Sequence, residues 1–276
     1  MPIQSSPDTP ASLPSSGTQH ALPRAWVVLP ALVLGSLAAI LGASGSNTEL
    51  FRALNAAAAG LPASMWAVLT VCGSVLGAIA LLAPTLKTQP RLLASAFLAA
   101  PLAILFSEGS KRYFDVLRPA GVLDADSFHL IGQKLYVHAF PSGHSTTAFV
   151  AAAALVLAWP RAERRPLVGL LVLGTAGLVA FSRIAVGAHW PLDVLTGAAG
   201  GWLCGACGVW LSARLRFWEG PGGVRAMATV ALATSLALLF VDAGQPDVRL
   251  FRIGLAAWGI GGAAAALMQG REDFQS

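Results

Sequence analysis

The sequence predicts an all-α protein, a polytopic bundle of transmembrane helices. Hydrophobic residues make up 55% of the 276 residues and charged residues only 11%, whereas soluble domains carry about 25% charged residues. The mean hydropathy is +0.67. The chain also contains repeated apolar stretches that are each about 20 residues long, which is the length that a helix needs to cross a bilayer. Composition and spacing therefore both indicate an integral membrane protein.

Eight stretches are candidate spans, near residues 25–43, 64–84, 91–107, 145–159, 166–183, 191–212, 225–241 and 250–268. The fourth is short, and the last is rich in Gly and Ala. Residues 1–24 are rich in Pro, Ser and Thr, which predicts a disordered tail. No cationic segment precedes an early apolar run, so we expect the first stretch to be a retained anchor. The chain then divides into a membrane-embedded core over 25–212 and additional transmembrane helices over 213–276.

The charge distribution predicts the orientation of the bundle. With eight spans and an inside N-terminus, ten Lys and Arg residues fall on the inner side and eight on the outer side. Three of the outer residues, Lys111, Arg118 and Arg183, belong to the signatures described next. Without them, ten Lys and Arg residues on the inner side stand against five on the outer side. The positive-inside rule favours this orientation, with the turn over 161–165 on the inner side. The sequence contains no run of basic residues of the kind that would indicate a nucleic-acid partner.

Three polar signatures interrupt the apolar chain: Lys111-x6-Arg118-Pro119, Pro141-Ser142-Gly143-His144, and Ser182-Arg183-x5-His189-x3-Asp193. They supply cations, two histidines, a carboxylate and a glycine at the start of a helix. Such a set can hold a phosphate, attack it and protonate the leaving group. An even number of crossings separates the signatures, so all three can meet on one face of the membrane, in a site over 108–193.

The second signature marks the N-terminus of a helix that continues into an apolar run. Free backbone N–H groups and the positive end of the helix dipole make such a terminus a site for an anion. Gly143 lets the backbone approach a phosphoryl oxygen closely, and the Ser142 hydroxyl can donate a hydrogen bond to it. Alone, the pattern also fits an ordinary capped helix with His144 at the interface.

The third signature places Asp193 four residues after His189, a spacing at which two residues share a helix face. The carboxylate can then accept a hydrogen bond from one imidazole nitrogen and leave the other as a nucleophile. Arg183 can bind phosphate oxygens in a bidentate fork. Alone, the pattern also fits a helix-capping His–Asp pair, and Lys111 with Arg118 also fits cations that reach for lipid headgroups.

With all three signatures in this order, the chain resembles the type-2 phosphatidic acid phosphatase superfamily, which includes lipid phosphate phosphatases, glucose-6-phosphatase and vanadium haloperoxidases. The resemblance covers residues 91–212 and every motif position. It implies a six-helix phosphatase core with its site at the outer face, here followed by two extra spans. It also implies that His189 is the nucleophile, His144 the general acid and Asp193 the residue that orients His189. The phosphate-binding residues would be Lys111, Arg118, Ser142, Gly143 and Arg183.

We therefore expect a lipid phosphatase of a bacterial inner membrane that works through a phosphohistidine at the periplasmic face. We expect no cofactor and no metal, because the cations and the helix N-terminus already face the phosphoryl group. Undecaprenyl pyrophosphate ranks first as substrate, then phosphatidylglycerophosphate or phosphatidate, then lipid A, by family analogy. Alternatives are a lipid phosphotransferase with the same residues, a haloperoxidase, and a non-catalytic lipid-binding or transport protein.

The remaining polar and small residues have structural interpretations. The stripe of glycines at every fourth position from Gly197 to Gly205 is typical of helix packing. Cys204-Gly-Ala-Cys207 lies in the same apolar stretch and is interpreted as small residues of a packed helix. We interpret His129 and His138 as parts of a solvated loop, and most tryptophans as interfacial anchors.

Overall fold

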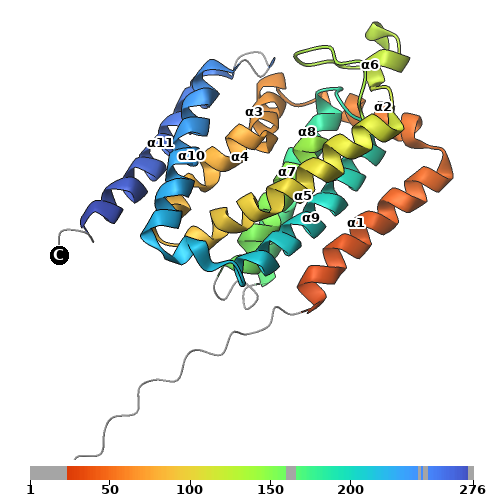
Figure 1. The fold of residues 1–276 in the computed structure, drawn as a ribbon. Coiled ribbons are helices and arrows are strands. Elements are labelled where there is room, and N and C mark those ends of the chain that lie inside the picture. Colours follow the sequence, from red (N-terminus) through yellow and green to blue (C-terminus); the bar gives the residue numbers. More distant parts are fainter. Residues whose placement is uncertain (1–23, 160–165, 242–243, 245–247, 273–276) are drawn as a thin grey trace, which may run out of the picture.

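The computed structural model describes residues 24–159, 166–241, 244 and 248–272. Nearly all of the predicted tail over 1–24 and the turn over 161–165 lie outside these residues. The described part contains helices and connecting segments and no β-strand (Figure 1). The main helices are α1 (Arg24–Ser44), α2 (Asn47–Ala58), α3 (Ala63–Gly73), α4 (Val75–Leu82), α5 (Pro90–Phe114), α6 (Pro119–Val122), α7 (Gly143–Ala153), α8 (Pro166–Ala185), α9 (Pro191–Ser212), α10 (Pro221–Phe240) and α11 (Arg249–Glu272).

Within the described residues, six helices are long and apolar enough to cross a membrane: α1, α5, α8, α9, α10 and α11. The described residues also include the short helices η1 (Ala83–Lys87), η2 (Ala125–Ser127), η3 (Ala154–Ala158) and η5 (Arg216–Glu219). The predicted all-α transmembrane bundle is therefore confirmed.

Two of the eight predicted spans are not single long helices. The stretch 64–84 is divided among α3, α4 and η1, because the backbone at Ser74 is extended (φ −69°, ψ 153°) and the Ser74 hydroxyl caps α4 by accepting the Gly77 N–H at 3.0 Å. The stretch 145–159 consists of α7 and the π-helical turn η3. Helix α2 was not predicted, because its polar residues interrupt the apolar run by which a span is recognised.

The glycine stripe of α9 packs against α7, as predicted. A Cβ atom at Gly201 would lie 2.8 Å from Cα of Thr146, and one at Gly205 would lie 2.5 Å from Cβ of Ala153. On another face of α9, a Cβ atom at Gly208 would lie 2.8 Å from Cβ of Ala99 in α5. Helix α9 is thus the central element against which α5 and α7, the helices that carry the first two signatures, both pack.

Three of the eight tryptophans lie inside the bundle, so the interpretation as interfacial anchors can apply only to the other five. Trp66, Trp190 and Trp202 are all buried. Each indole N–H donates to a backbone carbonyl from another part of the chain, that of Trp202 to Val27 in α1 at 2.9 Å and that of Trp66 to Ala58 in α2 at 2.9 Å. These side chains join helices instead of anchoring them at the membrane surface.

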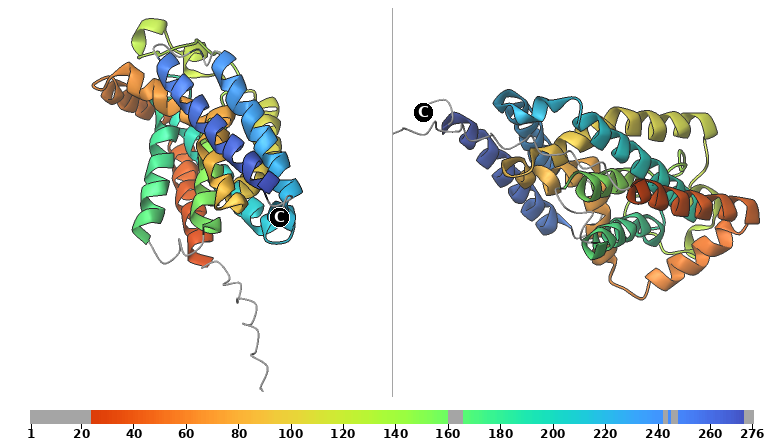
Figure 2. Two further views of the ribbon diagram at one scale, coloured as in Figure 1. Left: turned by 90° about the vertical axis from the view of Figure 1, so that its left-hand side faces the viewer. Right: turned by 90° about the horizontal axis from the view of Figure 1, so that it is seen from below.

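Helices α10 and α11 form a hairpin on the outside of α4 and η1 (Figures 1 and 2). A Cβ atom at Gly259 would lie 2.9 Å from Cα of Ala80, so α11 and α4 are in close contact. At the other side of the molecule, the C-termini of α5 and α8 and the N-termini of α7 and α9 meet at one end of the bundle (Figure 1). The three signatures therefore lie on one face, as the number of crossings predicted.

The contact between α7 and α9 yields a stability prediction. We expect Gly201→Ala to lower the melting temperature of the protein in detergent, because the new methyl group has no room against the α7 backbone, and overpacking costs about 1–3 kcal/mol. Gly177 in α8 is the matched control, since no atom lies within 4 Å of a Cβ atom there. Gly177→Ala should leave the melting temperature unchanged or raise it. Equal effects of the two substitutions would contradict this view of the packing.

Candidate active site

The third signature forms the turn between α8 and α9 and brings His189 to Asp193. His189 Nδ1 lies 3.4 Å from Asp193 Oδ2, and both side chains are 2% exposed. The same carboxylate oxygen accepts the backbone N–H of Trp190 at 2.9 Å. His189 precedes α9, which begins at Pro191. The predicted pair of His189 and Asp193 therefore exists. The two residues meet through a turn that caps α9, and they do not share a helix face as the spacing suggested.

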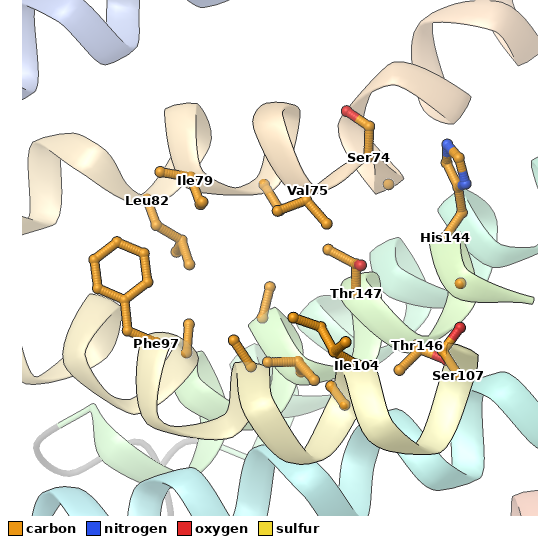
Figure 3. Close-up of a pocket in the computed structure, with 18 of the residues that line it drawn as sticks. Ser74, Val75, Ile79, Leu82, Phe97, Ile104, Ser107, His144, Thr146 and Thr147 are labelled. Carbon is orange, nitrogen blue, oxygen red and sulfur yellow. The ribbon is translucent and has the colours of Figure 1, made fainter. Parts of the chain in front are cut away.

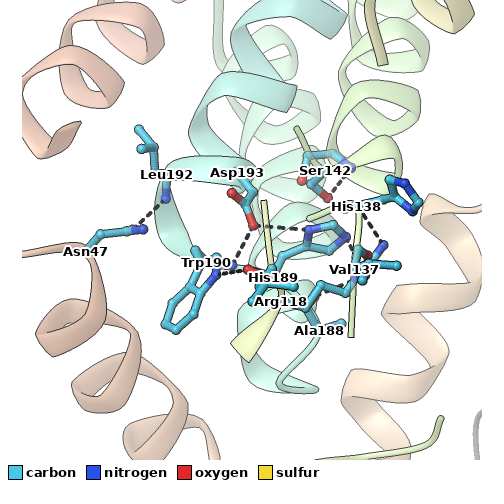
Figure 4. Close-up of polar contacts among 12 residues, drawn as sticks. Asn47, Arg118, Val137, His138, Ser142, Ala188, His189, Trp190, Leu192 and Asp193 are labelled. Atoms are coloured by element: carbon cyan, nitrogen blue, oxygen red, sulfur yellow. Dashed lines mark hydrogen bonds and ion pairs between the residues drawn. The ribbon is translucent and has the colours of Figure 1, made fainter. Parts of the chain in front are cut away.

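Arg118, from the first signature, donates to the other ring nitrogen of His189, with Nη1 and Nε2 3.1 Å apart (Figure 4). Its guanidinium also donates to the carbonyls of Val137 at 2.8 Å, Ala188 at 3.1 Å and His138 at 3.3 Å. An arginine has five N–H donors, so four of them are committed. Arg118 is therefore fixed beside His189 before any ligand binds.

Arg183, at the end of α8, is a buried cation that lacks an acidic partner among the described residues. Its side chain is 4% exposed, and its Nε has no hydrogen-bond partner. The hydroxyls of Ser107 and Ser145 are buried without partners as well. Burying an unpaired charge costs several kcal/mol, so unsatisfied donors of this kind indicate a place for an anion.

The second signature is attached directly to the third. The backbone N–H of Ser142 donates to the Asp193 carbonyl at 3.0 Å. Ser142 is the N-cap of α7, and its hydroxyl accepts the Ser145 N–H at 3.4 Å. A Cβ atom at Gly143 would lie 3.5 Å from Nζ of Lys111. The bare backbone at the start of α7 therefore faces the ammonium group of the first signature.

Lys111 is paired with a carboxylate that the sequence did not single out. Its Nζ lies 2.6 Å from Oε1 of Glu108, one turn earlier in α5. The Glu108 side chain is 54% exposed, whereas that of Lys111 is 16% exposed. An exposed acidic group thus balances the lysine in the ligand-free site, and an incoming anion would compete with it.

His144, the second residue of α7, stands at the end of a cavity of about 310 Å³ between α4, α5 and α7 (Figure 3). Ser107, Glu108 and Gly143 line the same end. The rest of the wall is mainly apolar and extends to Leu82 and Phe97. Cβ of His144 also lies 3.4 Å from where a Cβ atom at Gly73 would stand, so this glycine lets α3 approach the histidine.

The surroundings of His189 favour its neutral form. His189 lies between α8 and α9, outside the spanning helices. Burial, followed by the positive charges of Arg118 and Arg183, holds the pKa of His189 well below its usual range. A lowered histidine pKa means that the proton is lost at neutral pH. With Nδ1–H donated to Asp193, the lone pair resides on Nε2.

The structure brings together all eight predicted site residues: Lys111, Arg118, Ser142, Gly143, His144, Arg183, His189 and Asp193. His129 and His138 have exposed side chains, as predicted for loop residues. Sequence reasoning missed Glu108, Gly73 and Trp190, whose indole N–H donates to the Leu117 carbonyl at 2.8 Å. No group of three or more His, Cys, Asp or Glu side chains in the described ranges is placed to hold a metal ion.

The pair of Glu108 and Lys111 yields a prediction about anion binding. We expect Glu108→Gln to tighten the binding of inorganic phosphate about two- to fivefold, because an exposed ion pair of this kind is worth up to ~1 kcal/mol. Calorimetry in detergent measures the dissociation constant. Glu219→Gln is the control, since Glu219 pairs with Arg216 at the same spacing and the same 2.6 Å at the other end of the bundle. Unchanged or weaker binding by Glu108→Gln would contradict the competition.

Comparison with known proteins places these features in a family. The PAP2 superfamily model matches residues 92–217. An undecaprenyl-diphosphatase of Sulfolobus acidocaldarius is 34% identical over 113 residues, 40% of this chain and 47% of that one. Phosphatidylglycerophosphatase B of Escherichia coli is 40% identical over 86 residues, 30% of this chain and 32% of that one. The matches thus span less than half the length of these two relatives.

A solved structure extends the comparison to the fold. The crystal structure of Aquifex aeolicus LpxE superposes with a TM-score of 0.52 at 28% identity, and the match covers 59% of this chain and 94% of that one. The matched family region contains all three signatures, and six helices of the described chain can cross a membrane. The chain is a multi-pass membrane protein whose residues 92–217 match the PAP2 superfamily.

Proposed function

We propose that this protein is a lipid phosphatase that hydrolyses a phosphate ester or diphosphate through a phosphohistidine. One observation carries the proposal: a neutral, oriented His189 lies among cations, one of which, Arg183, is buried without an acidic partner in the described part of the chain. Such a site is complementary to a phosphoryl group, whose negative charge the cations would neutralise.

In the first step, phosphate displaces Glu108 from Lys111 and takes N–H donors of Arg183 and Arg118. Its remaining oxygen points at the N-terminus of α7, where the Gly143 backbone is accessible. As Arg118 turns to the phosphate, Nε2 of His189 is released and attacks phosphorus in line. The bond from nitrogen to phosphorus forms while the bond to the leaving oxygen breaks. Asp193 keeps the proton on Nδ1 and stabilises the positive ring.

His144 acts in both steps. In the ligand-free site, burial and the positive charges of Arg183, Arg118 and Lys111 hold the pKa of His144 well below its usual range, so His144 takes up a proton together with the anionic substrate, whose charge offsets these cations. As the bond to the leaving oxygen breaks in the first step, His144 gives this proton to that oxygen, and the lipid leaves as an alcohol or, from a diphosphate, as a monophosphate. The neutral His144 then takes a proton from water, whose oxygen attacks the phosphohistidine. Inorganic phosphate leaves, and both histidines return to their starting states. The cations supply the charge stabilisation, and the proposed reaction uses no metal.

The cavity beside His144 supports a substrate with a hydrocarbon chain. It begins at the polar residues of the site and continues between apolar walls that include Val75, Ile79, Leu82 and Phe97. A volume of about 310 Å³ is at the small end for ligand pockets, which suits part of one chain. We rank undecaprenyl pyrophosphate first, then phosphatidylglycerophosphate or phosphatidate, then lipid A. Two relatives described above, the undecaprenyl-diphosphatase and phosphatidylglycerophosphatase B, support placing these two lipids ahead of lipid A.

The substrate ranking is tested by comparing kcat/KM across these four lipids with purified protein in detergent. We expect the highest value for undecaprenyl pyrophosphate. We also expect every lipid to exceed a soluble phosphomonoester, because only a chain can use the apolar cavity. A preference for lipid A, or for the soluble ester over every lipid, would overturn the ranking.

The assignment of the nucleophile is tested by substitution at His189 and Asp193. We expect His189→Ala to abolish phosphate release and Asp193→Asn to lower it by roughly 10³–10⁴-fold, since the orientation of the imidazole is lost. Acid-labile phosphate should be trapped on the wild-type protein in a single turnover, with EDTA present. Near-normal turnover by His189→Ala would refute the mechanism. Transfer of phosphate to a second lipid, without release of inorganic phosphate, would identify a phosphotransferase.

We infer that the site faces the outside, which is the periplasm for a bacterial inner membrane. The excess of Lys and Arg at the opposite side supports this orientation. Cysteine at the exposed Val122 of α6 should react with an impermeant maleimide in intact cells, whereas cysteine at the exposed Glu219 should react only after permeabilisation. Both variants require replacement of the three native cysteines by alanine. The reverse labelling pattern would put the site on the inner side.

A further inference from the structure

Helix α2 is too short to cross a membrane at 12 residues, and it meets α3 at an angle of 119°. One side of it carries Asn47, Phe51 and Asn55, which are spaced four residues apart and therefore lie on one face. The chain has two asparagines, and both belong to this face. The other side of the helix, with Glu49 and Arg52, is exposed. We call Asn47, Phe51 and Asn55 the inner face of α2.

Asn55 binds the end of α8, two residues beyond Arg183. Its Nδ2 donates to the carbonyls of Ile184 at 3.0 Å and Ala185 at 3.2 Å, and also to the His129 carbonyl at 2.9 Å. Its Oδ1 accepts the His129 N–H at 2.8 Å. The last carbonyls of a helix have no partner within it. Asn55, which is 1% exposed, therefore caps α8 and fastens the neighbouring loop to it.

Asn47 binds the start of α9, on the other side of the nucleophile turn. Its Oδ1 accepts the Leu192 N–H at 3.0 Å (Figure 4). This is one of the N–H groups that the beginning of a helix leaves free, and it immediately precedes Asp193. Toward α9, Asn47 acts as an acceptor, whereas Asn55 acts as donor and acceptor toward its partners.

Phe51 occupies the space between the two asparagines. It is fully buried, and its ring lies 5.1 Å from the Trp190 indole and 5.6 Å from the Phe128 ring, both edge to face. Trp190 in turn follows His189 directly. The inner face of α2 thus contacts the segment from Ile184 to Leu192 at its beginning through Asn55, at Trp190 through Phe51, and at its end through Asn47.

We propose that the inner face of α2 positions the nucleophile turn, with Asn47 fixing the α9 terminus that carries Asp193. Its residues act on the reaction through His189 and Asp193 and do not touch the substrate. The inference rests on the proposed function, in which His189 is the nucleophile. Loss of the Asn47 bond would loosen the pair of Asp193 and His189 but would leave Lys111 and Arg183 in place. It should therefore slow the chemical step more than it weakens the binding of the substrate.

The experiment compares Asn47→Ala with Asn47→Asp. Alanine removes the acceptor but is a better helix former than asparagine, so α2 itself is not weakened. Aspartate keeps a carboxylate acceptor for the Leu192 N–H. We expect Asn47→Ala to lower kcat and the single-turnover rate of phosphohistidine formation about tenfold, since small misplacements of reacting groups cost up to ~100-fold. KM and the affinity for inorganic phosphate should change less than twofold, and Asn47→Asp should stay within about twofold of wild type in every quantity.

The controls separate positioning from folding. Arg52→Ala changes the exposed side of α2 and should leave all quantities unchanged, and binding of inorganic phosphate shows that each variant is folded. Asn55→Asp removes the donors that face three carbonyls, so it should lower kcat although the same substitution is tolerated at position 47. Where Asn55→Asp fails to fold, the pair of Asn47 variants decides alone.

Three results would overturn the positioning role. These are wild-type kcat in Asn47→Ala, equal impairment of the alanine and aspartate variants, and an effect on KM alone. Failure of the proposed function is distinct, because the wild-type protein itself would then form no phosphohistidine.

Discussion

The close approach of α7 to α9 is the constraint on which the site depends. Glycines at every fourth position of α9 let the two backbones approach without intervening side chains. Lipid tails are as apolar as the helices, so burial of apolar surface contributes little to helix association in a bilayer, and close packing of small residues has to supply it. At this separation the Ser142 N–H reaches the Asp193 carbonyl at 3.0 Å. This bond joins the backbones of the second and third signatures, and it thereby fixes where their side chains lie relative to one another.

The three cations of the site differ in how hydrogen-bond partners compensate their burial. Arg118 spreads its donors over three carbonyls and one imidazole, which compensates its burial. Arg183 has no comparable set of partners, and Lys111 relies on an exposed carboxylate. In the ligand-free protein, Arg118 is therefore stabilised by groups of the chain itself, whereas Arg183 and Lys111 are available to an anion. The neutral His189 lies among these cations, and in the proposed mechanism its charge changes only after it has reacted.

Much of the site could be predicted from the sequence, because the signature residues carry chemistry that few other roles require. The bundle could be predicted too, since hydropathy and span length depend on composition alone. The break at Ser74 could not, because a serine that caps a helix looks like any small residue inside an apolar run. Nor could α2, whose asparagines find their partners 74 to 145 residues away in the chain. The capping origin of the contact between His189 and Asp193 likewise depends on where α9 begins.

The hydrogen bond from Arg118 to Nε2 of His189 has a consequence for the empty protein. The lone pair that would attack phosphorus is occupied as long as no anion draws the guanidinium away. In the ligand-free protein, Nε2 of His189 is thus both buried and engaged. In the proposed mechanism, part of the free energy of phosphate binding would be used to release this nitrogen, so that binding would also activate it. Reactivity would then be a property of the complex with the anion and not of the ligand-free protein.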